Sequence, residues 1–459
     1  MALRIPFLTS SKSPLANENS LVEEDARARS SLQQLMCVGS IALLCMTLGG
    51  WIAWQYPFTD ALDRSGTPIG GDFPMFYLSG KAVWEHRTAD LYNLQANHHD
   101  LHQLFPGLAS QSVLPYRYPP FVAMLLSPLA ALPYGAALLV WIVFQIGCGI
   151  AAYAIARREL GILRSEWKQS LLIMSLGFPL VWEAILGGQA SLLAVLIVVA
   201  SEVLLRKKQW FWAGVVLGLA AYKPPVLLFV GLAQVIRVPR ILVGITASVL
   251  LLITASVGVC GWQTLKDYIN VTLQLSGTGP WNVPTPMEKV HGLVEIANWF
   301  SPRLGKWCVV LSGFAASIGV ATWLRRTSQD EQAKQDWQST QACADLGLAL
   351  LLLIQLTANP YLPIYDLVLL LPVIWFGGNA LWSTWGNPSA AGIRWLGPVL
   401  MALVMGAHLS QAICPPGTPK PFSLFLLGLA LWLAGVCHFW GRMKKGFDPN
   451  QEQSLLKVR

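Results

Sequence analysis

The chain has 459 residues, of which 54% are hydrophobic and only 12% are charged. A soluble domain averages about a quarter charged residues, so this composition and a mean hydropathy of +0.50 exclude an ordinary soluble protein. The net charge of +8 would suggest nucleic-acid binding in a soluble protein. In a membrane protein Lys and Arg gather in short cytoplasmic loops instead, so we expect no nucleic-acid partner.

The N-terminal stretch is polar and rich in serine over residues 1–34. A signal peptide would place its apolar stretch sooner and end it at a small-residue cleavage site. We therefore expect residues 1–34 to form a cytoplasmic tail before an uncleaved first helix at about 35–55. Residues 442–459, which follow the last apolar run, are predicted to form a second cytoplasmic tail.

Long apolar runs occupy the region 35–441, for example residues 134–156, 241–260 and 422–440. Each is close to the roughly 20 residues that cross the hydrocarbon core of a bilayer. We count about ten to thirteen such segments, several of them short or broken by proline. The pattern predicts an all-α polytopic membrane protein with its transmembrane domain over 35–441.

The basic clusters, such as "RKK" (206–208) and "RR" (325–326), define the orientation if all are placed in the cytoplasm. The outer face then receives a large first loop over 56–117 and several short turns. These turns are "GGQ" (187–189), "KPP" (223–225) and the segment 358–366. Residues 118–133 are too short and too rich in proline for a comfortable span, so we expect a short or re-entrant helix there.

Asp72 follows two glycines at the start of the first outer loop, in "PIGGDFPMFYL". An ionisable residue at the edge of an apolar region is a candidate functional residue, and the glycines allow a ligand or another backbone to approach closely. Asp is equally a favoured helix N-cap. The residues alone therefore leave Asp72 open between a cap and a catalytic carboxylate.

Lys223 stands between the apolar stretch "FWAGVVLGLAAY" and two prolines. Proline interrupts helical hydrogen bonding, and charges at broken membrane helices often bind anionic groups. This favours a ligand-binding role for Lys223 over a lysine that snorkels to the interface.

Arg117 in "PYRYPP" is either a phosphate-binding fork or an interfacial anchor. Gln189 completes the "GGQ" turn, and Asp366 begins an apolar run, for which an N-cap is the leading alternative. Asn359 and Tyr361 offer hydrogen bonds to a sugar, or close a turn.

The histidines and cysteines give little sign of a metal site or a disulfide framework. His98 and His102 lie four residues apart, but Asp100 falls on a different helical face and no third ligand accompanies them. The eight cysteines occur singly, mostly within apolar runs, where cysteine behaves as a small hydrophobe. We therefore expect no bound metal.

The chain resembles glycosyltransferase family 87, a family of polytopic membrane enzymes with the GT-C fold. The resemblance runs from about residue 51 to 385. It rests on the order and spacing of "DFPMFYLSGKAVWEHRTADLYN", "YRYPPFVAMLLSPLAALP", "GGQASLL" through "YKPPVLLFV", and "TANPYLPIYDLVLLLPVIW". In the last of these, Tyr365 and Asp366 are present without the histidine of the family's mannosyltransferases, which leaves the sugar open.

The resemblance implies transfer of a sugar from a polyprenyl-phosphate donor to a glycan or glycolipid acceptor. The reaction would occur on the outer, periplasmic face of a bacterial plasma membrane, without a metal ion. It implies a bundle of about 10–13 transmembrane helices whose first outer loop carries interfacial helices. Asp72 would be the general base of an inverting reaction, and Lys223 and Arg117 would bind the donor phosphate. Substrate contacts are assigned to Tyr77, Tyr118, Gln189, Asn359, Tyr361 and Asp366, with Phe73, Phe76 and Tyr77 as a docking platform for the donor lipid.

A transporter or flippase of a lipid-linked sugar is the alternative, because a broken helix with a charge at the break fits it equally well. The long aromatic first loop and the absence of a second copy of the "YKPP" motif favour the enzyme. A structural subunit of a membrane complex would have no need of Asp72.

Overall fold

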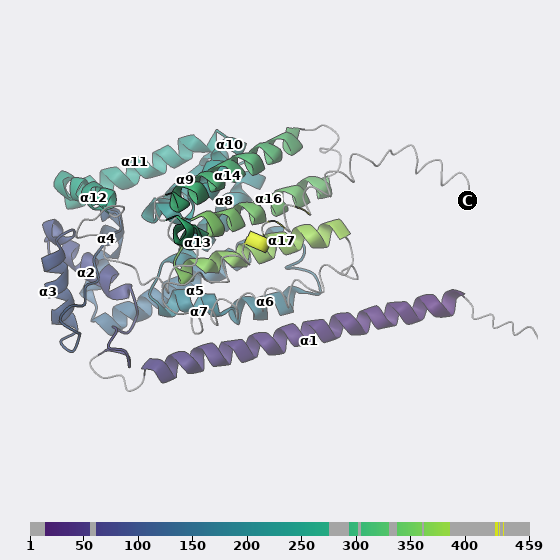
Figure 1. Cartoon of the computed structure of the whole chain (residues 1–459), viewed down its shortest axis with the longest axis horizontal. Coiled ribbons are helices and arrows are strands. Elements are labelled where there is room, and N and C mark those ends of the chain that lie inside the picture. Colours follow the sequence, from purple (N-terminus) through teal and green to yellow (C-terminus); the bar gives the residue numbers. More distant parts are fainter. Residues whose placement is uncertain are drawn as a thin grey trace, which may run out of the picture.

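The computed structural model describes residues 14–55, 61–274, 293–301, 304–329, 337–359 and 362–385, together with 427–429, 431 and 435. Within these ranges the chain forms α- and 3-10 helices and no strand (Figure 1). The all-α class is therefore confirmed. Most of the apolar run 422–440 and all of the tail 442–459 lie outside the described residues.

One end of the molecule, at the left in Figure 1, contains the elements of residues 56–117, predicted to be the first outer loop, and the segments that pack beside them. These elements are α2 (Phe73–Trp84), η1 (Thr88–Asp90), α3 (Leu94–Leu104), α4 (Pro120–Leu126), η2 (Ser127–Ala131) and α12 (Trp262–Gln274).

The remaining helices form a bundle that extends from this end along the long axis of the molecule (Figure 1). The longer ones are α1 (Pro14–Gln55), α5 (Tyr134–Glu159), α8 (Ser191–Arg206), α11 (Ile241–Cys260), α14 (Gly305–Gln329), α16 (Trp337–Ala358) and α17 (Leu370–Trp385). The shorter ones are α6 (Lys168–Leu176), α7 (Pro179–Leu186), α9 (Trp210–Gly218), η3 (Leu219–Tyr222), η4 (Pro224–Val226), α10 (Leu228–Arg237), α13 (Leu293–Phe300) and η6 (Ile364–Leu369).

Six segments among the described residues are long and apolar enough to cross a membrane, and the bent pair α6 and α7 would make a seventh. The polytopic class is thus confirmed. The larger number expected from the sequence also includes shorter apolar helices, over 120–131, 210–222 and 228–237, and apolar runs outside the described residues. The six segments are Ser30–Gln55, Tyr134–Glu159, Ile241–Cys260, Gly305–Gln329, Thr340–Ala358 and Ile364–Ser383.

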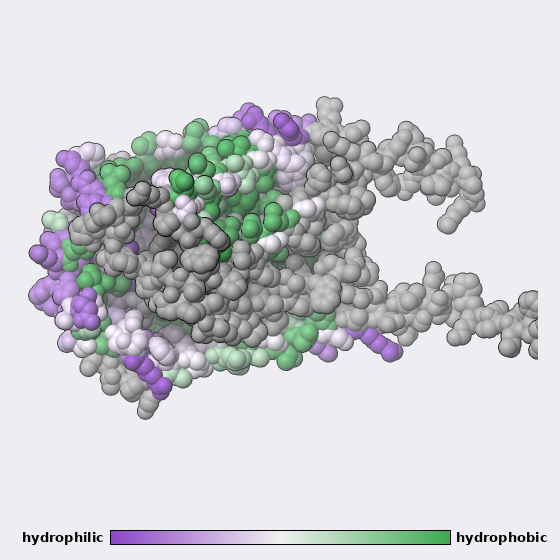
Figure 2. Space-filling model, viewed as in Figure 1, coloured by the Kyte–Doolittle hydropathy of each residue, from purple (hydrophilic) through white to green (hydrophobic). Residues whose placement is uncertain are grey.

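The core of the bundle lies around α16 and the segment η6–α17. In the most apolar 18-residue stretches of these two segments, 89% and 94% of the residues are buried, whereas in that of α1 only 11% are buried. Helices that bury so little while exposing large apolar side chains, such as Leu251 on α11, present them to lipid. Figure 2 shows the corresponding hydrophobic surface beside a hydrophilic end at the left.

Close helix contacts within the bundle depend on glycine. A Cβ at Gly214 of α9 or at Gly244 of α11 would collide with the backbone of the other helix. Membrane helices associate through such small residues because lipid gives them no hydrophobic reason to pair.

Three features of the structure differ from, or sharpen, the sequence-based expectations. First, α1 begins at Pro14, well before the expected start at about residue 35. Second, the doubtful 118–133 segment contains a helical stretch over 120–131 that spans only about 18 Å at roughly 1.5 Å per residue. The expectation of a short helix is confirmed.

Third, α2 is buried rather than spread on the membrane surface. Ten of its residues are buried, and it packs against α4 and η2. Phe73, Phe76 and Tyr77 are 0%, 1% and 7% exposed, so their predicted role as a docking platform for the donor lipid is wrong. The spacing of aromatic residues in the sequence predicted that this helix has an apolar face. It did not predict that α4 and η2 cover that face.

Candidate active site

Two glycine turns from distant parts of the chain interlock beside Asp72. Gly71 (φ +57°) and Gly188 (φ +70°) have backbone conformations that L-residues rarely adopt. A Cβ at Gly71 would collide with the backbone of Gly187, and one at Gly188 with that of Gly70. The Asp72 N–H also donates to the Gly187 carbonyl at 3.0 Å. Glycine thus allows the two turns to pack backbone to backbone.

Asp72 occupies the N-cap position of α2, but its side chain makes no capping hydrogen bond. Instead, Gln189 Nε2 donates to Asp72 Oδ2, and the Tyr118 hydroxyl donates to Gln189 Oε1 at 3.2 Å. The interpretation of Asp72 as a helix cap is therefore wrong. Its half-buried carboxylate lies at the end of a chain of hydrogen bonds that begins at Tyr118.

Lys223 and Asp366 form a buried ion pair. Lys223 Nζ lies 2.8 and 2.7 Å from the two Asp366 oxygens, and the side chains are 13% and 1% exposed. Lys223 also lies 4.7 Å from the centre of the Tyr365 ring. Lys223 therefore does not snorkel to the interface, and Asp366, which lies within η6, is an ion-pair partner rather than a cap.

The segment 189–191, at the start of α8, joins these two groups. Gln189 binds Asp72, and two residues later the Ser191 hydroxyl donates to Asp366 Oδ1 at 2.7 Å. Between them the Ala190 carbonyl accepts from the Tyr222 hydroxyl at 2.9 Å. The positive end of the α8 dipole also favours negative charge at this place. The segment 189–191 thus donates hydrogen bonds to both carboxylates, that of Asp72 and that of Asp366.

The break at Lys223 is stabilised by α16. Pro225 has a carbonyl that accepts hydrogen bonds from Gln355 Nε2 at 2.7 Å and from Asn359 Nδ2 at 3.3 Å. The Phe229 N–H donates to Gln355 Oε1 at 2.8 Å. Asn359, predicted to contact a sugar, therefore supports the broken backbone. Gln355 was not among the residues predicted from the sequence, although two amides four residues apart at the end of an apolar run were a signal for it.

The other residues predicted to belong to the site are Tyr77, Arg117 and Tyr361. Tyr77 packs against the rings of Phe73 and Tyr134 and donates to the Leu132 carbonyl at 2.9 Å, and burial raises its pKa. Arg117 directly precedes Tyr118, and its side chain is half-buried. Tyr361 lies outside the described residues.

The histidine pair of α3 is structural. The His98 and His102 rings lie 4.2 Å apart, and their Nε2 atoms lie 2.8 and 3.3 Å from the carbonyls of Ser110 and Ser112. Within the described part of the chain, no group of three His, Cys, Asp or Glu side chains could hold a metal ion.

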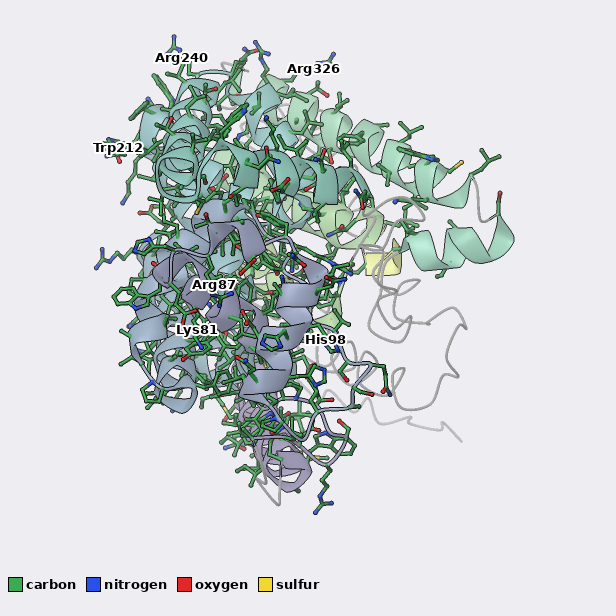
Figure 3. The ribbon with its side chains drawn as sticks, turned by 90° about the vertical axis from the view of Figure 1, so that its left-hand side faces the viewer. Lys81, Arg87, His98, Trp212, Arg240 and Arg326 are labelled. Carbon is green, nitrogen blue, oxygen red and sulfur yellow. The ribbon has the colours of Figure 1, made fainter. Side chains whose placement is uncertain are left out.

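Arg87 connects η1 and α3 to α2, at the end of the molecule that lies at the left in Figure 1. Its guanidinium contacts the carboxylates of Glu85, Asp90 and Asp100 at 2.8–2.9 Å, which ties η1 and α3 to the end of α2. Burial alone would lower the Arg87 pKa, but hydrogen bonds to these carboxylates outweigh it and raise the pKa. Figure 3, which looks onto this end, shows Arg87 and His98 there.

A second polar cluster, which was not predicted from the sequence, lies toward the other end of α8. Arg206 pairs with Glu202 at 3.2 Å and with Asp345 of α16. Arg237 of α10 contacts Glu202 at 3.0 Å, and Asn379 of α17 donates to Asp345 at 2.6 Å. The cluster ties four helices together at some distance from Asp72.

The fold and this arrangement define an integral, multi-pass membrane protein with a carboxylate and an ion pair joined at one end of its helix bundle. The chain belongs to glycosyltransferase family 87, whose model matches residues 116–353, just over half of its length. The matched region contains Tyr118, Gln189 and Lys223, whereas Asp72 and Asp366 lie outside it.

A curated relative is the polyprenol-phosphate-mannose-dependent alpha-(1-2)-phosphatidylinositol pentamannoside mannosyltransferase of Mycolicibacterium smegmatis. It is 34% identical over 115 residues, which are 24% of this chain and 26% of the relative. The matched stretch thus spans about a quarter of that protein. No solved structure matches the chain.

Proposed function

We propose that this protein is an integral-membrane glycosyltransferase that moves a sugar from a polyprenyl-phosphate donor to a glycan or glycolipid acceptor. The family and the name of the curated relative support this class of reaction. The observation that carries the proposal is the segment 189–191. Gln189 donates to the Asp72 carboxylate, and two residues later Ser191 donates to Asp366, which is the ion-pair partner of Lys223. Glycosyl transfer from a phosphate needs a base and a positive charge close together.

Asp72 is the proposed general base. A sugar hydroxyl is a poor nucleophile, and a positioned carboxylate that removes its proton in the transition state contributes typically about 10²–10⁴-fold. The hydrogen bond from Gln189 supports this role, because it favours the ionised carboxylate. Asp72 would accept the proton as the hydroxyl oxygen attacks the anomeric carbon and the bond to phosphate breaks.

Lys223 is the proposed cation for the leaving phosphate, with Arg117 as a second donor. Lys223 is already paired with Asp366, which makes a positive charge tolerable in a half-buried site. An ammonium group has three donors, so Lys223 can retain Asp366 while it binds a phosphate oxygen. The charge would stabilise the phosphate as it departs, without a requirement for a metal ion.

Inversion of the anomeric centre is the expected outcome. Retention by double displacement needs a carboxylate that attacks the sugar, by analogy with glycosidases. Asp366 is held by Lys223 and Ser191 and is therefore a poor nucleophile. A single displacement assisted by Asp72 follows.

Mannose is the first sugar to test, because the curated relative is named for a mannose donor; other hexoses and pentoses are the alternatives. We place the reaction on the outer face of a bacterial plasma membrane, because that orientation leaves the basic clusters in the cytoplasm.

The decisive experiment compares Asp72→Asn with the wild-type protein, purified and supplied with a panel of polyprenyl-phosphate sugars. Transfer should fall by at least about a hundredfold while thermal stability and donor binding persist. Asp63→Asn is the matched control, because Asp63 serves a local turn through Ser65 and Thr67. Near-normal turnover by Asp72→Asn would overturn the assignment of the base.

A flippase is the second candidate, favoured by the broken helix at Lys223. Proteoliposomes loaded with a fluorescent polyprenyl-phosphate sugar distinguish the two functions. Movement of the lipid between leaflets without sugar transfer would support the flippase and contradict the enzyme.

A further inference from the structure

We infer that Gln189 is not a substrate-binding residue but the positioning residue of the general base, and that Tyr118 sets the orientation of its amide. The inference rests on the proposed function of Asp72. Both residues were predicted from the sequence to bind substrate, and the inference gives them a different role.

The two hydrogen bonds of the Gln189 side chain fix which end of its amide faces Asp72. The Tyr118 hydroxyl donates to Gln189 Oε1, and a glutamine amide has its donors on the other atom, Nε2. With Oε1 turned to the phenol, Nε2 points to Asp72 Oδ2. The amide therefore presents a donor, never an acceptor, to the carboxylate.

Gln189 is buried too deeply to contact a substrate. Gln189 is 1% exposed, and its backbone N–H is held by the Ala184 carbonyl at 3.0 Å. Both ends of its amide are used, one by Tyr118 and one by Asp72. An amide that is so deeply buried and already bonded at both ends lacks the access that contact with a sugar hydroxyl requires.

Tyr118 is held in position by Phe76 and Tyr92. The ring centre of Tyr118 lies 4.8 Å from that of Phe76, which is itself buried in α2. Its carbonyl accepts from the Tyr92 hydroxyl at 2.7 Å. The phenol is thus fixed by the outer elements, and it transmits that fixed position through Gln189 to Asp72.

Two consequences follow for catalysis. A donor on Oδ2 stabilises the ionised carboxylate, so its removal should raise the pKa of Asp72. It also fixes the orientation of the base, and a catalytic group must be held within about half an ångström of its productive position. Loss of Gln189 should therefore affect the chemical step and its pH dependence rather than substrate binding.

The test is steady-state kinetics of Gln189→Leu and Tyr118→Phe across pH, with the purified full-length protein, a polyprenyl-phosphate sugar and its acceptor. For Gln189→Leu we expect kcat to fall by about ten- to a hundredfold, the effect of one hydrogen bond to a charged group, with both KM values within about twofold. The acid limb of the pH–rate profile should move to higher pH. Tyr118→Phe should shift both quantities in the same direction by less.

The matched control is Gln263→Leu. Gln263 Nε2 donates to Asp267 Oδ1 at 2.9 Å on α12, so this variant removes the same kind of bond from an exposed site outside the cluster. Its kcat and pH profile should equal those of the wild type.

Three outcomes separate the possibilities. A raised KM with unchanged kcat for Gln189→Leu would mean that Gln189 binds substrate, and would overturn the inference. If Gln189→Leu does not fold, Tyr118→Phe decides, and an unshifted pH profile overturns the inference. Asp72→Asn is measured in parallel: if it is active, the proposed base fails, whereas an inactive Asp72→Asn beside a normal Gln189→Leu contradicts only the positioning role.

Discussion

At the scale of single residues, the site depends on groups whose partners are far away in the chain. Asp72 and Gln189 are 117 positions apart, and Lys223 and Asp366 are 143 apart. The sequence identified all four as polar exceptions in an apolar chain. The local alternative that the sequence offered for Asp366, a helix cap, is wrong, because its carboxylate is bound by the distant side chains of Lys223 and Ser191.

Gly188→Ala should impair both stability and turnover. A Cβ there would meet the backbone of Gly70 and Phe73, and an L-residue at this positive φ costs about 1–2 kcal/mol in addition. Thermal unfolding and the transfer assay measure the two losses. Gly258→Ala is the control, because a Cβ at Gly258 of α11 meets nothing within 4 Å; equal behaviour of the two variants would contradict the interlock.

Lys223→Met should destabilise the protein by roughly 3–5 kcal/mol, because it leaves the Asp366 carboxylate buried without its partner. The double variant Lys223→Met/Asp366→Leu should recover most of that stability, since no charge remains unpaired. Neither variant should recover donor affinity, measured by binding of a polyprenyl-phosphate sugar. Wild-type affinity in the stable double variant would show that Lys223 serves the fold alone.

At the scale of elements, α8 joins the two polar clusters of the bundle. Its first residue, Ser191, contacts Asp366, and its last turns carry Glu202 and Arg206 in the second cluster. These groups are separated by roughly 16–22 Å along the helix. The first cluster is proposed to perform the reaction, and the second stabilises the packing of α8, α10, α16 and α17.

Asp345→Asn should therefore lower stability without a specific loss of chemistry. It weakens the pairing of Arg206, and loss of one partner of a buried ion pair costs roughly 3–5 kcal/mol. We expect a lower unfolding temperature in detergent and an unchanged kcat for the folded fraction. A fall in kcat at full stability would instead couple the second cluster to the reaction.

At the scale of the whole molecule, the site is joined through Gln189 and Asp72 to the start of α2, which lies with α3 and α4 at one end of the molecule (Figure 1). Basic residues such as Arg158, Arg206 and Arg326 occur in the last turns of α5, α8 and α14. This asymmetry agrees with an outer site and a cytoplasmic opposite end.

Sidedness is tested with single cysteines in a cysteine-free background. Gln111→Cys and Lys208→Cys both replace exposed residues, the first in the outer loop and the second after α8. A membrane-impermeant maleimide added to intact spheroplasts should label Gln111→Cys and leave Lys208→Cys unlabelled until the cells are lysed. The opposite pattern would reverse the proposed orientation.

The sequence by itself determined the class of the protein and the bounds of elements such as α11, because hydropathy over about twenty consecutive residues is a local property. It also identified Asp72, Lys223, Gln189 and Asp366, since polar groups are costly among apolar neighbours. The tertiary structure alone decided that α2 is buried, that Asn359 supports the proline break, and which polar group binds which. Those outcomes depend on backbone contacts such as the glycine interlock, which brings together residues more than a hundred positions apart.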